Sequence, residues 1–389
     1  MKILQVIPVL SIRFGGPVAV VRSVSRELAK RHDVTVYTTT ALDRENDLKE
    51  TPFEVENNGY RIVYFPRILK FTGFNISPAM TRAMKKSLRK YDIIHLHSWR
   101  HFQDIITHHY SMKYNVPYVL QPHGSLPRIG SKRWLKWIYD MSFGRSLLRH
   151  ASKVLALNKV EADQCRYMGV PERKIAVIPN GIDPSEYAEL PPKGAFKKKF
   201  NISEDKKIIL YLGRIHKTKG IDLLIKAYAY LIKNMNFKDA VLVIAGPDDG
   251  YLNEAKALAN SLRVYKSTIF IGFLNTEDKI RSLVDGDVFV TPSFYGFPIT
   301  FLEACAVGTP IITTSLGDRL EWIDGKVGYV TQPTPKDLAE AVYRIISDEE
   351  LRKKLSRNCI NTVKSYFSLE KVVERLEKIY EKVVKSKVL

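Results

Sequence analysis

The sequence contains little cysteine. Only Cys165, Cys305 and Cys359 occur among its 389 residues, they form no C-x-x-C pair, and no histidine lies beside them at the spacing of a zinc ligand. This pattern argues against a disulfide framework and against a structural zinc site. We therefore expect a reducing, cytoplasmic setting.

Long apolar runs are missing as well. No stretch approaches the ~20 apolar residues that a membrane-spanning helix needs, so we expect a chain that does not cross a bilayer. The apolar amino terminus is interrupted by Gln5 and Pro8, and no small-residue cleavage site follows it. We interpret this segment as a first strand and not as a signal peptide.

Acidic residues are outnumbered by basic ones. Residues 1–190 hold 29 basic and 17 acidic side chains, residues 191–389 hold 32 and 24, and the formal net charge is +20. Such an excess suits nucleic acid, an anionic membrane surface or anionic small substrates. The basic residues are spread over both halves and no nucleic-acid-binding motif is present. We expect no nucleic-acid partner, although the charge keeps that function as an alternative.

Short β-type runs alternate with helical segments, which predicts parallel sheets with helices on both faces. A chain of this length exceeds one ordinary core. We predict the α/β class, with two doubly wound Rossmann-like domains facing across a cleft and with C-terminal helices. Strands are expected near 2–8, 33–40, 60–65, 92–97, 117–122, 153–158, 174–179, 207–213, 240–245, 268–272, 287–291, 310–314 and 327–331. Helices are expected near 17–31, 78–91, 102–114, 131–149, 159–168, 221–234, 251–264, 276–284, 299–307 and 335–346.

A stretch rich in proline, glycine and lysine separates the two cycles of strands and helices. We assign residues 1–185 to an N-terminal domain, 186–205 to a linker, 206–366 to a C-terminal domain and 367–389 to a C-terminal helix. The helical spacing from about 349 to 387 does not decide which domain the last helices cover. The N-terminal domain is one candidate for 367–389.

Ligands of doubly wound sheets bind outside the carboxyl ends of the strands. After the first strand, Gly15 and Gly16 precede Pro17 at the start of a helical segment, where backbone N–H groups can approach a ligand. The pattern is not G-x-G-x-x-G, and no acidic residue ends the second strand, so a nicotinamide dinucleotide is disfavoured. A tight turn with no ligand is the alternative.

Histidines gather at the ends of two further strands. His95 and His97 alternate with apolar residues and therefore face the same side of one strand. His123 precedes Gly124 in the turn after the next strand, where its ring can reach a ligand and share protons with sugar hydroxyls. Zinc lacks a third ligand of suitable spacing, so packed histidines are favoured over a metal site.

In the second half, Gly213, Arg214 and Lys219 follow a buried strand and precede a helix that opens at Gly220. Guanidinium, ammonium and free N–H groups at such a place can hold a diphosphate, although a merely solvated basic loop is the alternative. Farther on, Glu303 lies one turn into a helix that follows another strand and a glycine turn. It can accept two ribose hydroxyls, or it is an acid favoured in a first helical turn.

Together these segments resemble the retaining, nucleotide-sugar-dependent glycosyltransferases of group 1 (family 4), which have the GT-B fold. The resemblance covers almost the whole chain. It is carried by Gly15-Gly16, Pro122-His123-Gly124, Ile178 to Asp183, Gly213-Arg214 through Lys219-Gly220, Pro292-Ser293, Gly296-Phe297, Glu303-Ala304, Gly308-Thr309-Pro310 and Glu321.

The resemblance implies an N-terminal acceptor-binding domain and a C-terminal domain that binds a UDP- or GDP-sugar. It implies that Arg214 and Lys219 hold the donor diphosphate, that Glu303 holds the ribose, and that His123 contacts the donor sugar. The Gly15-Gly16 loop, Gly213 and the backbone of Phe297, Pro298, Ile299 and Thr300 complete the implied donor site. The implied reaction moves a hexose to a glycan or lipid-linked acceptor with retention and without a metal or other cofactor, because cationic groups stabilise the leaving diphosphate.

Two positions depart from the family pattern. The family has a glutamate directly before Gly-Phe, where this chain has Tyr295, so either the phenol takes over that contact or donor turnover is weak or absent. Asp318 stands where the family commonly has glycine. Asp285-Gly286-Asp287 spells D-x-D, but it lies between a helix and a strand, which favours capping over metal binding. A sugar-nucleotide epimerase of similar fold is the nearest alternative function.

Basic and aromatic residues are interleaved between Arg128 and Tyr139, where Trp134 and Trp137 alternate with Lys132, Arg133 and Lys136. Such a segment suits shallow contact with anionic lipid head groups at the inner face of a membrane. The alternatives are a solvated basic helix and tryptophans that belong to the core.

Overall fold

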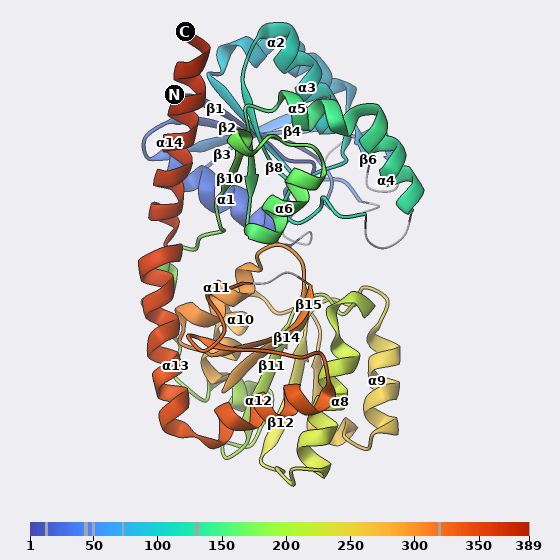
Figure 1. Cartoon of the computed structure of the whole chain (residues 1–389), viewed down its shortest axis with the longest axis vertical. Helices are drawn as coiled ribbons and strands as arrows, with labels where there is room; N and C mark the ends of the chain where they lie inside the picture. Colours follow the sequence, from blue (N-terminus) through green and yellow to red (C-terminus); the bar gives the residue numbers. More distant parts are fainter. Residues whose placement is uncertain are drawn as a thin grey trace. The chain divides into compact units, whose positions relative to one another are not determined.

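The computed structural model describes residues 1–11, 15–42, 46–48, 51–71, 74–128, 132–317 and 320–388. The chain forms two compact units (Figure 1). The first consists of Met1–Gly181 and Leu369–Leu389, and the second of Ile182–Ser368. Each unit has a central sheet with helices packed on it.

The sheet of the first unit has eight strands in the order β10-β9-β8-β7-β1-β2-β4-β3, and all neighbours are parallel except β3 and β4. Along the chain the strands are β1 (Lys2–Val6), β2 (Asp33–Thr39), β3 (Phe53–Asn57), β4 (Tyr60–Phe65), β7 (Ile93–His97), β8 (Tyr118–Gln121), β9 (Lys153–Ala156) and β10 (Ile175–Val177). The short pair β5 (Leu69–Phe71) and β6 (Phe74–Ile76) forms a separate two-stranded sheet.

The helices of the first unit are α1 (Gly16–Ala29), α2 (Pro78–Ser87), α3 (Phe102–Tyr114), α4 (Arg133–Tyr139), α5 (Arg145–His150), α6 (Lys159–Tyr167) and α14 (Leu369–Val388). Local chemistry fixes several of their ends. The Ser77 side chain caps α2 by accepting from the Met80 N–H, and Asn158 caps α6 by accepting from the Glu161 N–H. These caps satisfy N–H groups that have no partner within the helix.

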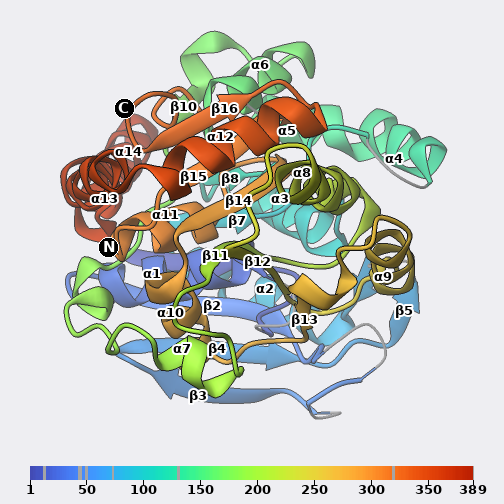
Figure 2. The ribbon, with the colours of Figure 1, turned by 90° about the horizontal axis from the view of Figure 1, so that it is seen from below.

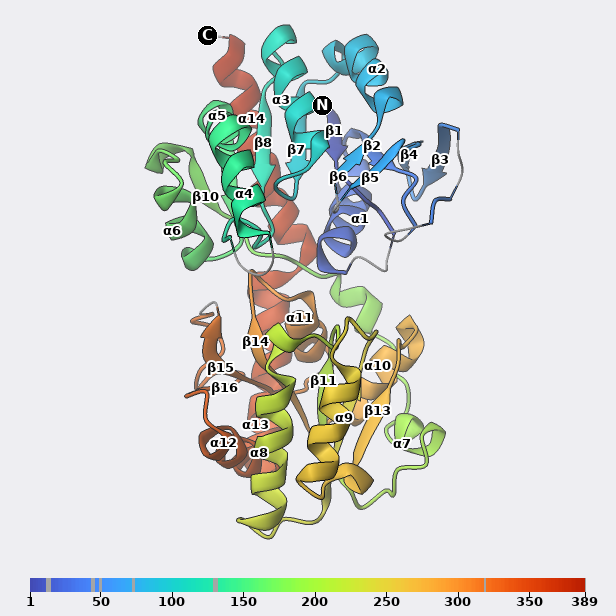
Figure 3. The same cartoon turned by 90° about the vertical axis from the view of Figure 1, so that its right-hand side faces the viewer.

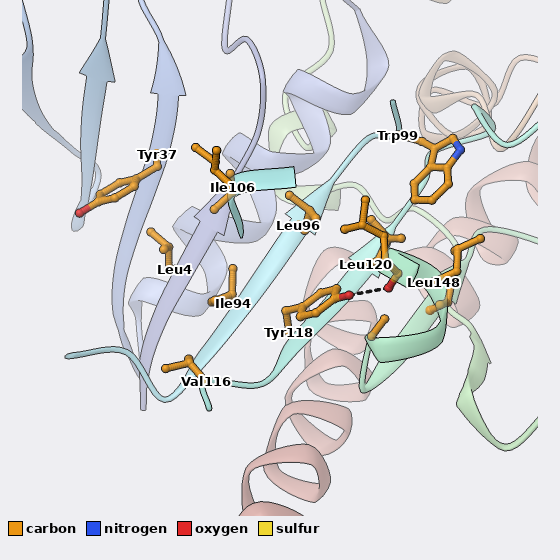
Figure 4. Close-up of a cluster of buried hydrophobic side chains, with 14 of the residues drawn as sticks. Leu4, Tyr37, Ile94, Leu96, Trp99, Ile106, Val116, Tyr118, Leu120 and Leu148 are labelled. Atoms are coloured by element: carbon orange, nitrogen blue, oxygen red, sulfur yellow. Dashed lines mark hydrogen bonds between the residues drawn. The ribbon is translucent and has the colours of Figure 1, made fainter. Parts of the chain in front are cut away.

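The main core of the first unit lies on one face of its sheet. Leu4, Ile94 and Leu96 point to this face from β1 and β7, and Ile106 and Leu148 pack there from α3 and α5 (Figure 4). Because side chains alternate along a strand, His95 and His97 face the opposite side. That side is covered by α1 and α14, which pack against each other.

The last helix, α14, belongs to the first unit. Both carboxylate oxygens of Glu377 on α14 accept from Arg31, and the Tyr380 hydroxyl lies 2.6 Å from Nδ1 of His95. A π-helical segment (Val363–Phe367) and the extended backbone of Ser368 separate α14 from α13 (Glu349–Thr362). The helical pattern expected from 349 to 387 is therefore interrupted where the chain returns to the first unit.

The sheet of the second unit has six parallel strands in the order β13-β12-β11-β14-β15-β16. They are β11 (Lys207–Leu212), β12 (Ala240–Ala245), β13 (Thr268–Ile271), β14 (Val288–Phe294), β15 (Ile311–Gly317) and β16 (Gly328–Thr331). This is the 3-2-1-4-5-6 order of a dinucleotide-binding sheet, with its switch point between β11 and β14.

Helices cover both faces of this sheet (Figure 2). On one face α8 (Ile221–Lys233) packs beside α9 (Leu252–Ser261), as Figure 3 shows, and beside α12 (Pro335–Ser347). On the other face α10 (Thr276–Asp285) packs with α7 (Ala195–Lys199) and α11 (Ile299–Ala306), and α11 packs with α13. The predicted class, two doubly wound α/β domains with C-terminal helices, is confirmed.

Some local structure differs from the prediction. The helix expected over 131–149 is divided into α4, a π-helical segment (Asp140–Gly144) and α5. The antiparallel strand β3 and the pair β5–β6 were not predicted. Residues expected as a linker over 186–205 include α7, whose first turn is held by the Asp285 carboxylate through the N–H groups of Gly194, Phe196 and Lys197. This segment belongs to the second unit because a buried acid on α10 ties it there.

Asp285→Ala would leave three backbone N–H groups without their acceptor in a buried place. We expect the free energy of unfolding of the second unit to fall by about 2–4 kcal/mol. Hydrogen exchange of the β11 and β14 amides measures this loss. The matched control is Asp205→Ala, which removes an exposed carboxylate and should change stability by less than about 0.5 kcal/mol. Equal effects of the two variants would contradict the role of Asp285.

Candidate active site

The first candidate region lies in the second unit, where β11 ends. Gly213 and Arg214 follow this strand, a 3₁₀ turn covers Lys217–Lys219, and Gly220 begins α8 with a φ of 69°. The Tyr211 hydroxyl donates to the Arg214 carbonyl at 2.9 Å. A side chain at position 213 would meet that hydroxyl at 3.0 Å, so glycine keeps the turn close to the strand.

A second glycine, which the sequence analysis did not identify, lies against this turn. Gly246 follows β12 with a φ of 145°, and a Cβ atom there would lie 1.9 Å from the Gly213 carbonyl oxygen. Only glycine permits this approach of two backbones. The signal available in the sequence was the Gly-Pro-Asp-Asp run directly after a predicted strand.

Two cationic side chains leave this turn. Arg214 pairs with Asp249, another residue that the sequence analysis missed. Among the residues that the structure describes, no acid pairs with Lys219. Burial, and next the nearby charge of Arg214, lower the pKa of Lys219 to about 8. A partly desolvated ammonium without a counter-ion is a place where an anion is stabilised.

The end of β14 lies next to the same turn. A Cβ atom at Gly220 would meet Cβ of Pro292 at 2.9 Å, and the 3₁₀ turn packs on β14. Phe297, Pro298, Ile299 and Thr300 follow and open α11, whose first N–H groups have no partner within the helix. The Phe297 ring is buried and stacks on Trp322. Asp318 lies outside the described residues.

Glu303 lies on the buried face of α11. Its Oε1 accepts from the Lys279 ammonium of α10 at 2.6 Å. Burial, and next the negative charge of Glu303, raise the pKa of Tyr187, which lies in a 3₁₀ turn (Pro184–Tyr187). The predicted ribose acceptor is therefore held by two side chains of its own unit, Lys279 and Tyr187, that the sequence analysis did not identify.

The D-x-D sequence serves the fold. Asp285 caps α7, and Asp287 accepts from the Ile208 N–H at 2.9 Å and lies 3.4 Å from Arg352. Within the described part of the chain, no cluster of three or more His, Cys, Asp or Glu side chains could hold a metal ion. The three cysteines are buried and unpaired.

The other candidate region lies in the first unit, where β1 and β7 are adjacent and their crossovers diverge. Gly15 has a φ of 83° and caps α1, and a side chain at Gly15 or Gly16 would meet no described atom within 4 Å. The positive φ requires glycine at position 15. As far as the described residues show, a ligand has room near the start of α1.

His123 lies in the turn after β8 with a φ of 55°. Its Nε2 lies 2.9 Å from Nδ1 of His97, and the adjacent Gly124 N–H donates to the buried Glu161 carboxylate at 2.6 Å. The prediction that His95 and His97 face one side of their strand is confirmed, because their rings lie 3.9 Å apart. Burial lowers the pKa of His123 to about 3. The ring is thus neutral near pH 7.

The predicted residues form two groups. Gly213, Arg214, Lys219 and the start of α11 meet at the switch point of the second sheet, and Glu303 follows one turn later. Gly15, Gly16 and His123 lie at the carboxyl edge of the first sheet. Each group has the place that ligands take in an open parallel sheet.

Sequence comparison agrees with the geometry. The family described as Glycosyl transferases group 1 matches residues 192–362, and the one described as Glycosyltransferase Family 4 matches residues 14–186. A glycosyltransferase of Methanocaldococcus jannaschii, itself uncharacterized, is 30% identical over 345 residues, which cover 83% of this chain and 84% of that protein. The chain belongs to the glycosyltransferases of group 1.

Further relatives and solved structures agree. The UDP-Gal:alpha-D-GlcNAc-diphosphoundecaprenol alpha-1,3-galactosyltransferase of Escherichia coli is 27% identical, with 79% of each chain covered. Sucrose-phosphate synthase of Thermosynechococcus elongatus has a TM-score of 0.79 at 21% identity, with 99% of each chain covered. HepE of Anabaena, solved with UDP and glucose, has a TM-score of 0.78 at 16% identity, with 98% of this chain and 100% of HepE covered. These likenesses show the GT-B fold.

Gly246→Ala tests the close approach of the two backbones. We expect the β12 turn to move away from Gly213, because the Cβ atom has no room, and the free energy of unfolding to fall by about 2 kcal/mol or more. Thermal unfolding measures the loss. Gly250→Ala is the control, since a Cβ atom there would meet nothing within 4 Å although φ is also positive. A Gly246 variant as stable as the Gly250 variant would contradict this packing.

Proposed function

We propose that this protein transfers a hexose from a UDP-sugar to a lipid-linked glycan acceptor, with retention of configuration and without a metal ion. The observation that carries the proposal is Lys219, a partly buried ammonium that has no acid partner among the described residues and lies beside Arg214. A diphosphate supplies the charge that this site lacks. The site lies at a helix start on the switch point of a nucleotide-binding sheet.

The proposed roles follow from position. Lys219 and Arg214 neutralise the diphosphate, and the open N–H groups at the start of α11 bind phosphate and sugar oxygens. Glu303, held in place by Lys279, accepts from the ribose hydroxyls. As the glycosidic bond breaks, negative charge grows on the diphosphate. The fixed cations stabilise that charge in place of a metal.

UDP is preferred over GDP because the Escherichia coli relative is named for UDP-Gal and the HepE structure contains UDP. Tyr295, which stands where the family has a glutamate, lies partly exposed at the end of β14. We propose that its phenol takes the contact of that glutamate with a donor-sugar hydroxyl. A phenol donates as well as accepts, so the sugar it selects can differ from the sugar that a carboxylate selects.

The proposed lipid-linked acceptor is supported by the surface around α4. Trp134 and Trp137 are 64% and 51% exposed, and so are not core residues. Ile138 and Met141, one and four residues after Trp137, are also exposed, and the neighbouring sequence carries exposed Lys132, Arg133, Arg145 and Arg149. Across the described residues, no helix combines the length and the apolar character needed to cross a bilayer.

This helix is anchored from its other side. The buried Tyr139 hydroxyl donates to Asp104 at 3.1 Å, and the buried Asp140 carboxylate accepts from Arg100 and Arg128. The anchor holds the apolar and basic face outward. We propose that this face rests on an anionic membrane surface, since exposed tryptophans with basic neighbours suit the head-group region. The Escherichia coli relative is named for a diphosphoundecaprenol acceptor.

Lys219→Ala and Arg214→Ala test the donor site. We expect each variant to bind UDP about 10- to 100-fold more weakly, because a charged contact with phosphate is lost, and to keep the unliganded melting temperature. Binding to the parent should also weaken about tenfold per pH unit above pH 8, as Lys219 loses its proton. Thermal shift and calorimetry with UDP between pH 7 and 9.5 measure both effects.

Lys217→Ala is the matched control, because Lys217 is an exposed lysine of the same turn. It should bind UDP like the parent. Lys219→Arg should bind UDP without the loss above pH 8, since a guanidinium does not titrate there. Parent-like UDP binding by both alanine variants would refute the site. Turnover of UDP-sugars with the product analysed by NMR then tests retention.

Flotation with vesicles tests the membrane surface. We expect binding to vesicles that contain phosphatidylglycerol and none to pure phosphatidylcholine, with release at high salt. The double variant Trp134→Ser, Trp137→Ser should bind these vesicles at least about tenfold more weakly than the parent. Tyr167→Ser, which removes an exposed aromatic ring from α6, is the control. If the parent protein does not float with anionic vesicles at low salt, the proposed membrane contact is excluded.

The epimerase alternative loses support from the family, which consists of glycosyltransferases. An epimerase would release free UDP and altered sugar in the absence of any acceptor. Incubation of the protein with a UDP-sugar alone distinguishes the two functions.

A further inference from the structure

A chain of buried hydrogen bonds leads from the core of the first unit to His123. Nε2 of His97 lies 2.5 Å from Oε1 of Gln5 on β1, and Nδ1 of His97 lies 2.9 Å from Nε2 of His123. Gln5 and His97 are fully or almost fully buried. Among the described residues, the His123 ring makes its hydrogen bond through Nε2, so Nδ1 remains for a ligand.

The charge states of His97 and His123 in this hydrogen-bond chain follow from burial. Desolvation lowers the pKa of His97 well below its ordinary value, and next the charges of His95 and His123 lower it further. The pKa of His123 is lowered to about 3 by the same burial. Both rings are therefore neutral near pH 7. Each has one N–H and one lone pair, so the hydrogen bonds decide which nitrogen holds the proton.

The donors and acceptors of this hydrogen-bond chain are set at Gln5, where the chain begins. The Tyr380 hydroxyl of α14 lies 2.6 Å from Nδ1 of His95. The carbonyl oxygen of Gln5 is the atom that faces His97. The Gln5 amide nitrogen has no hydrogen-bond partner among the described residues.

From this geometry we infer that Gln5 and His97 are positioning residues that fix the tautomer of His123. Gln5 Oε1 can only accept, so His97 donates from Nε2 and keeps a lone pair on Nδ1. His123 then donates from Nε2 to that lone pair. Its Nδ1 is left without a proton, as a hydrogen-bond acceptor.

The consequence for function rests on the proposed transferase activity. His123 accepts a hydrogen bond from a hydroxyl of the transferred sugar or of the acceptor, and it does so without taking up a proton. In the opposite tautomer, Nδ1 of His123 would carry an N–H that points at the substrate hydroxyl. That N–H would disfavour a hydroxyl that donates to His123. A fixed acceptor also gives a reason for the buried polar side chain of Gln5 on β1, where the neighbouring positions are apolar.

NMR on the full-length parent protein tests the inference without any substrate. With ¹⁵N-labelled histidine, we expect His123 at pH 7 to show a protonated Nε2 and an unprotonated Nδ1, and His97 the same. A His123→Asn variant assigns the signals. A protonated Nδ1 of His123, or a charged ring, would overturn the inference.

Gln5→Met removes the acceptor and keeps the size of the side chain. We expect a mixture of His123 tautomers and a fall in kcat of about tenfold, with UDP binding like that of the parent. Thr38→Val is the control, because the buried Thr38 hydroxyl on β2 has no partner among the described residues and is not part of the hydrogen-bond chain from Gln5 to His123. It should leave tautomer and kcat unchanged.

An unchanged His123 tautomer in the Gln5→Met protein would exclude a role for Gln5. If this variant does not fold, the spectrum of the parent decides alone. If the parent protein does not bind UDP, the proposed function is contradicted. The NMR result on the His123 tautomer stays valid in that case.

Discussion

Parallel strand pairing is the constraint on which both candidate regions depend. Each crossover connection brings the chain back to the edge of the sheet where the parallel strands begin. The carboxyl ends of all parallel strands therefore lie at the opposite edge. At one place in each sheet the order reverses, between β1 and β7 and between β11 and β14, and the crossovers leave to opposite faces. Gly15 and Gly16 follow β1, the Gly213–Lys219 turn follows β11, and the start of α11 follows β14, whereas His123 follows β8, the strand next to β7. The parallel order therefore brings the predicted residues to one edge of each sheet.

Charge in the second unit is arranged around this constraint. Asp285 and Asp287 are buried acids, but backbone N–H groups and basic side chains satisfy them, so they stabilise the fold. Glu303 is paired with Lys279. Lys219 differs because burial weakens its charged state and no described acid compensates. The same desolvation that makes this ammonium unfavourable in the free protein strengthens its attraction to a diphosphate.

The histidines at the candidate site of the first unit are organised by hydrogen bonds. His95 and His97 on β7 and His123 after β8 are neutral because they are desolvated, so their chemistry depends on which nitrogen carries the proton. Helix α14 comes from the far end of the chain, and its Tyr380 contacts this cluster. The first unit is therefore completed only when the last residues of the chain have folded onto it.

The sequence by itself determined the class of fold, most strand and helix positions, and the identity of the turns that carry Arg214, Lys219 and His123. It could do so because alternation, helical spacing and glycine turns are local signals. Only the tertiary structure decided that Asp249 pairs with Arg214, that Lys279 holds Glu303, that Gly246 admits the Gly213 backbone, and that Gln5 lies beside His97. These partners are far apart along the chain, and strand order brings them together. Burial, which sets the pKa of Lys219 and of His123, is likewise a property of the packed protein and not of any short segment.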